Sequence, residues 1–182
     1  MKAVAAIITI LFSTLSLSVA DDKSDGGKTS KADVGGLTFA FSEPWVAAEP
    51  SSRMVKAYIE VTPEGEGMEK VGAKFYYFGA GQGGSAKANV DRWVGQFEGK
   101  PKVEEKVVDK GDGKKITLVY GTGTYLDGPP FGQKVPKAGY ALHGAIIEGG
   151  DAPVFIKMTG PEKSVAAIRE SFEKLAASPF AE

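Results

Sequence analysis

The chain has 182 residues, with no cysteine, one histidine, 22 Lys and Arg, and 23 Asp and Glu. The absence of cysteine excludes disulfides, thiol nucleophiles and Cys-held metal or iron–sulfur centres, and one histidine argues against a metal site or catalytic triad built on histidine. A formal net charge of −1 argues against nucleic-acid binding driven by bulk charge, and 42% hydrophobic residues suffice for one domain with its own core.

Residues 1–20 are typical of a secretory signal peptide. Lys2 supplies the positive start, an apolar run follows, and Ser18-Val19-Ala20 places small residues at the last and third-last positions. The sequence therefore predicts a Sec-type leader cleaved after Ala20, and a secreted or periplasmic protein without a membrane span after cleavage. An uncleaved N-terminal anchor is the alternative, but the apolar run is short for one.

The segment 21–35 is charged and rich in Gly and Ser, and it has almost no large apolar side chains. Such a segment buries too little surface to order itself. We therefore predict a flexible polar linker over 21–35, a single domain over 36–177 and a C-terminal tail over 178–182.

Seven segments alternate or cluster apolar side chains as β-strands do. They are 37–41, 55–61, 75–78, 103–109, 116–120, 140–147 and 154–159. Gly-rich turns at 111–113 and 148–151 predict that the last four pair as two hairpins. Within the last strand, Lys157 alternates with Phe155, and we expect it to reach solvent at the rim of the sheet.

Two segments follow the helical period instead. In 86–97 the apolar residues fall on about a third of the helical wheel, and Ser85 is the expected N-cap. In 161–176 an apolar stripe follows Pro161, and Thr159 and Glu162 have the spacing of a capping box. The order of elements predicts an α+β fold, with a mainly antiparallel sheet of about six or seven strands packed with two main helices.

A Gly-rich stretch, Gly79-Ala80-Gly81-Gln82-Gly83-Gly84-Ser85, joins a predicted strand to the first helix. Three of its glycines fit the G-x-G-x-x-G pattern of dinucleotide sites. The order of elements around it is not β-α-β, which favours a turn that needs positive φ angles. Anion binding at the helix N-terminus stays open as a further interpretation.

The first helix carries a polar edge formed by Asn89, Arg92 and Gln96, beside Trp93. Arg, Asn and Gln beside an aromatic ring suit a carboxylate, a phosphate or a sugar. The alternative is structural: Asn89 would then satisfy the backbone of the Gly-rich loop, and Trp93 would fill the core. Phe131, in a Pro-rich loop over 127–138, is a second candidate for partner binding unless it folds back on the sheet.

The candidate binding residues are thus Gln82, Gly83, Gly84, Ser85, Asn89, Arg92, Gln96 and Phe131. His143 lies on an apolar strand face and is expected to be a core residue. No motif pairs two carboxylates for acid–base work, Asp109 to Gly113 lacks a complete calcium loop, and no metal site or cofactor is predicted.

Two stretches carry a resemblance to known proteins. The run 81–85 with Asn89, Arg92-Trp93 and Gln96-Phe97, and the end 155–161, are similar to an uncharacterised family of exported bacterial proteins. The order of elements, with a last helix opened by Thr159-Gly160-Pro161, resembles the PsbP-like fold of photosystem extrinsic proteins and of the Ran-release factor Mog (the Mog/PsbP fold). This resemblance implies a binding or accessory role, without a catalytic residue to carry over.

The sequence therefore predicts an exported, non-enzymatic binding or accessory protein. Its partner would be a protein, or a small anionic or saccharide ligand in the cell envelope, and not a nucleic acid. One alternative is an envelope hydrolase or carbohydrate-active enzyme whose carboxylates are brought together by the fold. A self-associating structural protein of the envelope is the other.

Overall fold

The computed structural model describes residues 28–129 and 131–181. The expected signal peptide, and residues 21–27 of the expected linker, lie outside the described residues. The strands are β1 (Ser30–Val34), β2 (Leu37–Phe41), β3 (Val46–Ala48), β4 (Val55–Val61), β5 (Val71–Tyr77), β6 (Lys102–Gly111), β7 (Lys114–Asp127), β8 (Val135–Glu148) and β9 (Val154–Pro161). The helices are α1 (Ala86–Val94), α2 (Glu162–Ala167), α3 (Arg169–Ala177) and the short 3₁₀ helix η1 (Ser178–Phe180).

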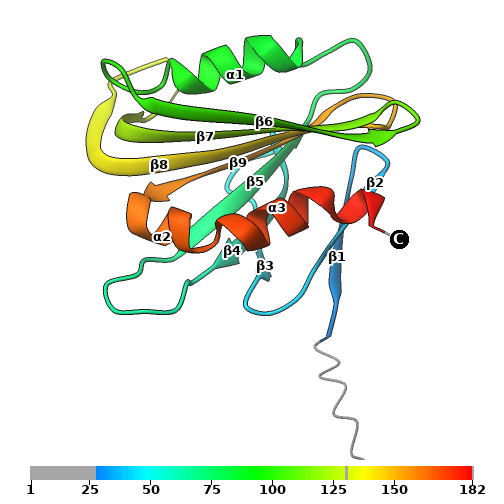
Figure 1. Ribbon diagram of the computed structural model, residues 1–182, viewed down its shortest axis with the longest axis horizontal. Helices are drawn as coiled ribbons and strands as arrows, with labels where there is room; N and C mark the ends of the chain where they lie inside the picture. Colours follow the sequence, from blue (N-terminus) through cyan, green and yellow to red (C-terminus); the bar gives the residue numbers. More distant parts are fainter. Residues whose placement is uncertain (1–27, 130, 182) are drawn as a thin grey trace, which may run out of the picture.

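Seven strands form one antiparallel sheet in the order β3-β4-β5-β9-β8-β7-β6 (Figure 1). β9, the last strand in the chain, therefore lies in the middle, between β5 and β8. β1 and β2 form a separate hairpin. The predicted α+β class with a mainly antiparallel sheet is confirmed.

One face of the sheet packs on α2, α3 and the β1–β2 hairpin. Alternate residues of the strands point to this side and form the larger core, in which Phe39, Phe75 and Phe172 are fully buried. Phe39 and Phe75 meet edge to face, with ring centroids 5.0 Å apart, so the hairpin is fixed on β5.

The opposite face carries α1, which lies on the other side of the sheet from α2 and α3 (Figure 1). Val90, Trp93 and Phe97 pack there on β7, β8 and β9. A Cβ atom at Gly144 of β8 would lie 2.5 Å from Trp93 Cζ3, so only glycine lets the indole lie this close to the strand.

The boundaries of the domain differ from those expected. β1 starts at Ser30, within the predicted linker, because Val34 is buried and every residue of the strand pairs with β2. At the other end, Phe180 of η1 packs against the core, so residues 178–180 of the predicted tail belong to the domain.

The second predicted helix is divided in two. Ile168, with φ −110° and ψ 16°, separates α2 from α3. The capping box over Thr159 and Glu162 is wrong, because Thr159 still belongs to β9 and α2 has no side-chain cap. Ser85 does cap α1, since its Oγ accepts from the Ala88 N–H at 3.2 Å.

Candidate functional site

α1 leaves part of its face of the sheet uncovered. Beside the helix, side chains of β4, β5 and β9 line an open cleft of about 480 Å³, a volume typical of a small-molecule site. The sheet forms its floor, and α1, residues 125–128 and Lys134 contribute its walls. Of the described residues, five cationic side chains and one carboxylate line the cleft: Lys70, Lys74, Arg92, Lys134, Lys157 and Asp127.

Lys157 lies on β9 at the floor of the cleft and is partly buried. Its Nζ donates to the Tyr125 hydroxyl oxygen at 2.8 Å and also to Gln96 Oε1. The Tyr125 hydroxyl in turn donates to Gln96 Oε1 at 2.9 Å. No carboxylate of the described residues forms an ion pair with Lys157, so two neutral oxygens hold this cation.

The surroundings of Lys157 disfavour its charged form. Burial is the main reason that the pKa of Lys157 is lowered to about 8. Three neighbouring cations lower it further: Lys74, Arg92 and Lys134. The carboxylate of Asp127 raises the pKa of Lys157 by a smaller amount. Burial raises the pKa of Tyr125 to about 12, so Tyr125 keeps its proton.

An aromatic wall adjoins these charges. The rings of Tyr76 and Phe78 are stacked, with centroids 6.4 Å apart, and Phe78 also contacts Phe155 at 5.8 Å. Phe78 is 39% exposed, and Met54 beside the cleft is 63% exposed. The cleft therefore offers apolar surface and positive charge together.

The polar edge expected on the first helix lines this cleft. Asn89 is fully buried, and its Nδ2 donates to Gly83 O at 2.8 Å and Ser85 O at 2.9 Å. Its Oδ1 accepts from Arg92 Nη2. Asn89 thus satisfies the backbone of the Gly-rich loop and also orients Arg92, while Gln96 binds Lys157.

The other candidate residues do not line the cleft. Gly83 and Gly84 have φ of +86° and +77°, and a Cβ at Gly83 would lie 2.9 Å from the Phe155 ring, so these glycines allow the turn to pack. Gln82 is exposed, and Ser85 is the N-cap of α1. Phe131 is 95% exposed and does not fold back on the sheet.

The residues at the floor of the cleft were not predicted from the sequence. The expectation that Lys157 reaches solvent at the rim is wrong, because β9 is the middle strand. Tyr125 was not singled out, and neither was Lys74. One sequence feature could have indicated this site: Lys157 lies on the same face of its predicted strand as the apolar residue Phe155.

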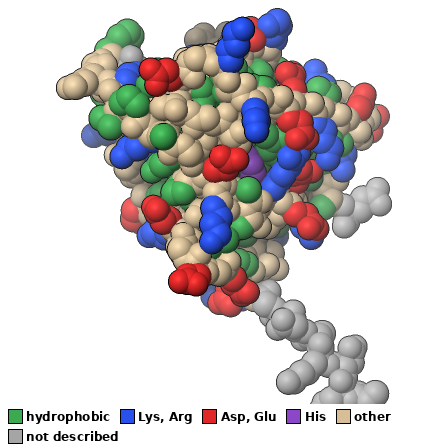
Figure 2. Space-filling view, turned by 60° about the vertical axis from the view of Figure 1, so that its left-hand side comes forward, with side chains coloured by type: hydrophobic (Ala, Val, Ile, Leu, Met, Phe, Trp, Pro, Cys, Tyr) green, Lys and Arg blue, Asp and Glu red, His purple; other side chains and the backbone are tan. Residues whose placement is uncertain are grey.

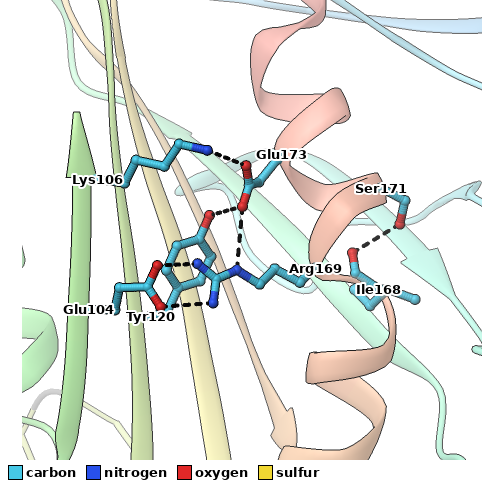
Figure 3. A network of polar contacts seen from close by, with 7 residues as sticks. All are labelled: Glu104, Lys106, Tyr120, Ile168, Arg169, Ser171 and Glu173. Atoms are coloured by element: carbon cyan, nitrogen blue, oxygen red, sulfur yellow. Dashed lines mark hydrogen bonds and ion pairs between the residues drawn. The ribbon is translucent and has the colours of Figure 1, made fainter. Parts of the chain in front are cut away.

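A second polar cluster ties α3 to β6 and β7 on the opposite face of the sheet (Figure 3). Glu173 accepts from the Tyr120 hydroxyl at 2.7 Å and from Lys106 Nζ at 2.9 Å. The Arg169 guanidinium lies 3.7 Å above the Tyr120 ring and binds both carboxylate oxygens of Glu104. The cluster joins three elements across the edge of the core.

The two carboxylates of this cluster do not suit acid catalysis. The hydrogen bond from Tyr120 is the largest cause that lowers the pKa of Glu173 to about 2, and Arg169 lowers the pKa of Glu104. A general acid at neutral pH needs a raised pKa instead. This cluster therefore favours an anchoring role for α3.

His143 lies beneath this cluster and is 4% exposed, as expected of a core residue. Its ring meets Tyr120 edge to face, with centroids 4.8 Å apart. Its Nδ1 has no hydrogen-bond partner among the described residues, and burial lowers the pKa of His143 to about 4. His143 is therefore neutral at physiological pH.

Positive and negative side chains are interspersed over the face drawn in Figure 2, in keeping with the near-zero net charge. Within residues 28–129 and 131–181, no group of three or more His, Asp and Glu side chains is placed to hold a metal ion. No helix in that part of the chain is long and apolar enough to cross a membrane.

The chain matches no protein-family model and no curated protein. Among solved structures it is similar to the solution structure of cyanobacterial PsbP (CyanoP) from Synechocystis sp. PCC 6803, with 13% sequence identity and a TM-score of 0.49. The similarity covers 82% of this chain and 90% of that one.

Proposed function

We propose that the protein is an exported, non-enzymatic binding protein that holds a small organic anion in the cleft beside α1. The observation that carries this proposal is Lys157, a partly buried cation held by two neutral oxygens. A buried charge without a counter-ion costs stability, so its presence at the floor of a cleft favours a bound anion as the missing partner.

The hydrogen bonds of Lys157 support this proposal. An ammonium group has three N–H donors, and the described residues accept two of them, at Gln96 and Tyr125. The third is free for an acceptor in the cleft. Arg92, oriented by Asn89, adds a planar guanidinium that suits a carboxylate or phosphate.

The wall of the cleft favours an organic anion over an inorganic one. Tyr76, Phe78 and Met54 adjoin the cations, so a ligand with a ring or an alkyl chain buries apolar surface while its anionic group meets Lys157. The alternative of a carboxylate enzyme is less well supported at this cleft, because Asp127 is the one carboxylate among the described residues that line it.

The test uses pyridoxine 5′-phosphate as an aromatic anionic probe and uncharged pyridoxine as its control, with residues 21–182 in a calorimeter. We expect the phosphate to bind and pyridoxine to bind much more weakly. Lys157→Met and Arg92→Met should each lower the affinity for pyridoxine 5′-phosphate by about 10–100-fold, because a hydrogen bond to a charged group contributes about 1.5–3 kcal/mol.

Lys87→Met is the matched control for Arg92→Met, because Lys87 lies on the same helix, pairs with Asp91 and does not line the cleft. The Lys87→Met variant should bind pyridoxine 5′-phosphate with the same affinity as the unaltered protein. If neither the probe nor any member of a panel of aromatic and aliphatic carboxylates and phosphates binds, the proposal is wrong.

A further inference from the structure

We propose that the amine of Lys157 captures the carbonyl group of the bound anion as an imine, so that the ligands of this cleft are anions that carry an aldehyde or a ketone. This inference rests on the proposed function, because it assigns a reaction to the same site. It depends on the hydrogen bonds of Nζ, the groups that surround it and its place in the cleft.

The two hydrogen bonds of Lys157 can be made by the ammonium and also by the neutral amine, which is the minor form at pH 7.5 and the one that reacts with a carbonyl. A neutral amine has two N–H donors and one lone pair, and the two described acceptors, Gln96 Oε1 and the Tyr125 hydroxyl oxygen, take two donors. The lone pair is then left without a protein partner among the described residues. Because Lys157 lines the cleft, this lone pair is available to a carbonyl carbon.

Four charged groups surround Lys157, whereas β8, which pairs with β9 at Gly144, contributes none of them. Lys74 comes from β5, Arg92 from α1, Lys134 from the loop before β8, and Asp127 from the end of β7. Three of these four carry positive charge and favour the neutral amine. Because these three cations line the same cleft as Lys157, a ligand that carries both groups can place its anionic group among the cations and its carbonyl beside Nζ.

The lowered pKa adds a kinetic advantage to this geometry. At pH 7.5 an ordinary lysine with a pKa of 10.5 is about 0.1% neutral, whereas one with a pKa of about 8 is about one quarter neutral. Lys157 therefore presents roughly two hundred times more free amine than a surface lysine.

The reaction balances without an oxidant or a reductant. Nζ attacks the carbonyl carbon, a C–N bond forms and the C=O π bond opens to give a carbinolamine. The C–O bond then breaks, and the two hydrogens of the amine leave with the oxygen as water. The Tyr125 hydroxyl, 2.8 Å from Nζ, is placed to pass a proton from nitrogen to the departing oxygen.

The experiment compares two probes that differ at one carbon. Pyridoxal 5′-phosphate carries an aldehyde where pyridoxine 5′-phosphate carries an alcohol. The protein is incubated with the aldehyde at low stoichiometry, reduced with borohydride, digested, and mapped by mass spectrometry. We expect the reduced adduct on Lys157 in clear excess over every other lysine, and we expect excess pyridoxine 5′-phosphate to suppress it.

Lys157→Arg separates this inference from the proposed function. It keeps the positive charge but has no reactive amine, so it should give no adduct in the cleft, whereas Lys87→Met, which lies outside the cleft, should bind pyridoxine 5′-phosphate and form the adduct on Lys157 as the unaltered protein does. If the adduct is spread evenly over surface lysines while the unaltered protein still binds pyridoxine 5′-phosphate, the inference of an imine on Lys157 is wrong and the proposed anion site is retained. If the alcohol does not bind and Lys157 is not modified, both proposals fail for this ligand class. Peptide mapping of the unaltered protein decides the matter even where the variant does not fold.

Discussion

Replacing Lys157 by Met should make the protein more stable at pH 7, although it removes two hydrogen bonds. Residues that serve a ligand are commonly held at a cost to stability, and removing them then stabilises the fold. Met has a similar length, has no charge and fits an apolar surrounding, so it tests the cost of the buried charge directly.

The magnitude follows from the pKa of Lys157. The pKa of about 8 in the folded chain lies about 2.5 units below the ordinary value of 10.5, so keeping the lysine charged at pH 7 costs about 3 kcal/mol. The two lost hydrogen bonds offset about 2 kcal/mol of this gain. The bond from Tyr125 to Gln96 is retained, so neither side chain is left without a partner. The net expectation is a gain of about 1 kcal/mol in the free energy of unfolding, or a few degrees in Tm.

The pH dependence gives a sharper test than the gain alone. Because the folded pKa is the lower one, the unfolded chain binds more protons between about pH 8 and 10.5, and the unaltered protein gains stability as the pH rises through this window. The cost of the charge falls from about 3 kcal/mol at pH 7 to about 1 kcal/mol at pH 10. The advantage of Lys157→Met should therefore shrink by about 2 kcal/mol and change sign.

Urea unfolding of both proteins at pH 7 and pH 10 measures this difference, in which groups common to the two proteins cancel. The control is Lys87→Met, whose side chain is 83% exposed and which should change stability by less than about 0.5 kcal/mol at both pH values. A variant that is less stable by 1 kcal/mol or more at pH 7, or a difference that is equal at both pH values, would refute the reasoning. Lys157 would then be a structural residue.

Two further predictions concern the core. The pKa of His143 is about 4 in the folded chain and about 6.5 when unfolded, so the unfolded chain binds more protons in this window, and the protein should lose up to about 3 kcal/mol as the pH falls from 6.5 to 4. His143→Leu should remove most of this loss of stability, as measured by urea unfolding at each pH. If the variant loses as much stability between pH 6.5 and 4 as the unaltered protein does, the loss belongs to other groups. Gly144→Ala would place a Cβ 2.5 Å from the Trp93 ring and should lower the free energy of unfolding by about 1–3 kcal/mol. A neutral effect on Tm would mean that α1 shifts to accommodate the methyl group.

The strands were predictable because their signal is local. Alternation at 55–61 or 116–120 is visible in a few residues, and the hairpin turns join neighbours in the chain. β1 was missed because its two inward residues, the small Ala32 and the single larger apolar Val34, lie among the polar residues Ser30, Lys31 and Asp33 and are followed by glycines. The break at Ile168 was missed because the apolar stripe runs through both α2 and α3 without interruption.

The helical edge of the site was predictable for the same reason. Asn89 and Arg92 are brought together by the helical period, Gln96 lies in the turn directly after α1, and all three line the cleft. Lys157 is 61 residues from Gln96 and 32 from Tyr125, and it meets them because β9 is inserted between β5 and β8. No local pattern encodes that strand order, so the floor of the cleft required the structure.

The anchoring of α1 explains how a short helix can serve a binding site. At its start, Asn89 binds two carbonyls of the Gly-rich loop, and at its end the Gln96 carbonyl accepts from the Leu126 N–H at 2.8 Å. The helix is thus held at both ends, with Arg92 between them. Because this wall is already ordered, little conformational entropy is lost there when a ligand binds. A preorganised site avoids this part of the free-energy cost of association. The backbone carbonyl of Gln96 thus joins the end of the helix to β7, whereas its side-chain Oε1 accepts from Lys157 and from the Tyr125 hydroxyl. Gln96→Ala keeps this carbonyl and removes only the Oε1 acceptor, so it should weaken binding of pyridoxine 5′-phosphate by releasing Lys157 while the helix stays joined to β7.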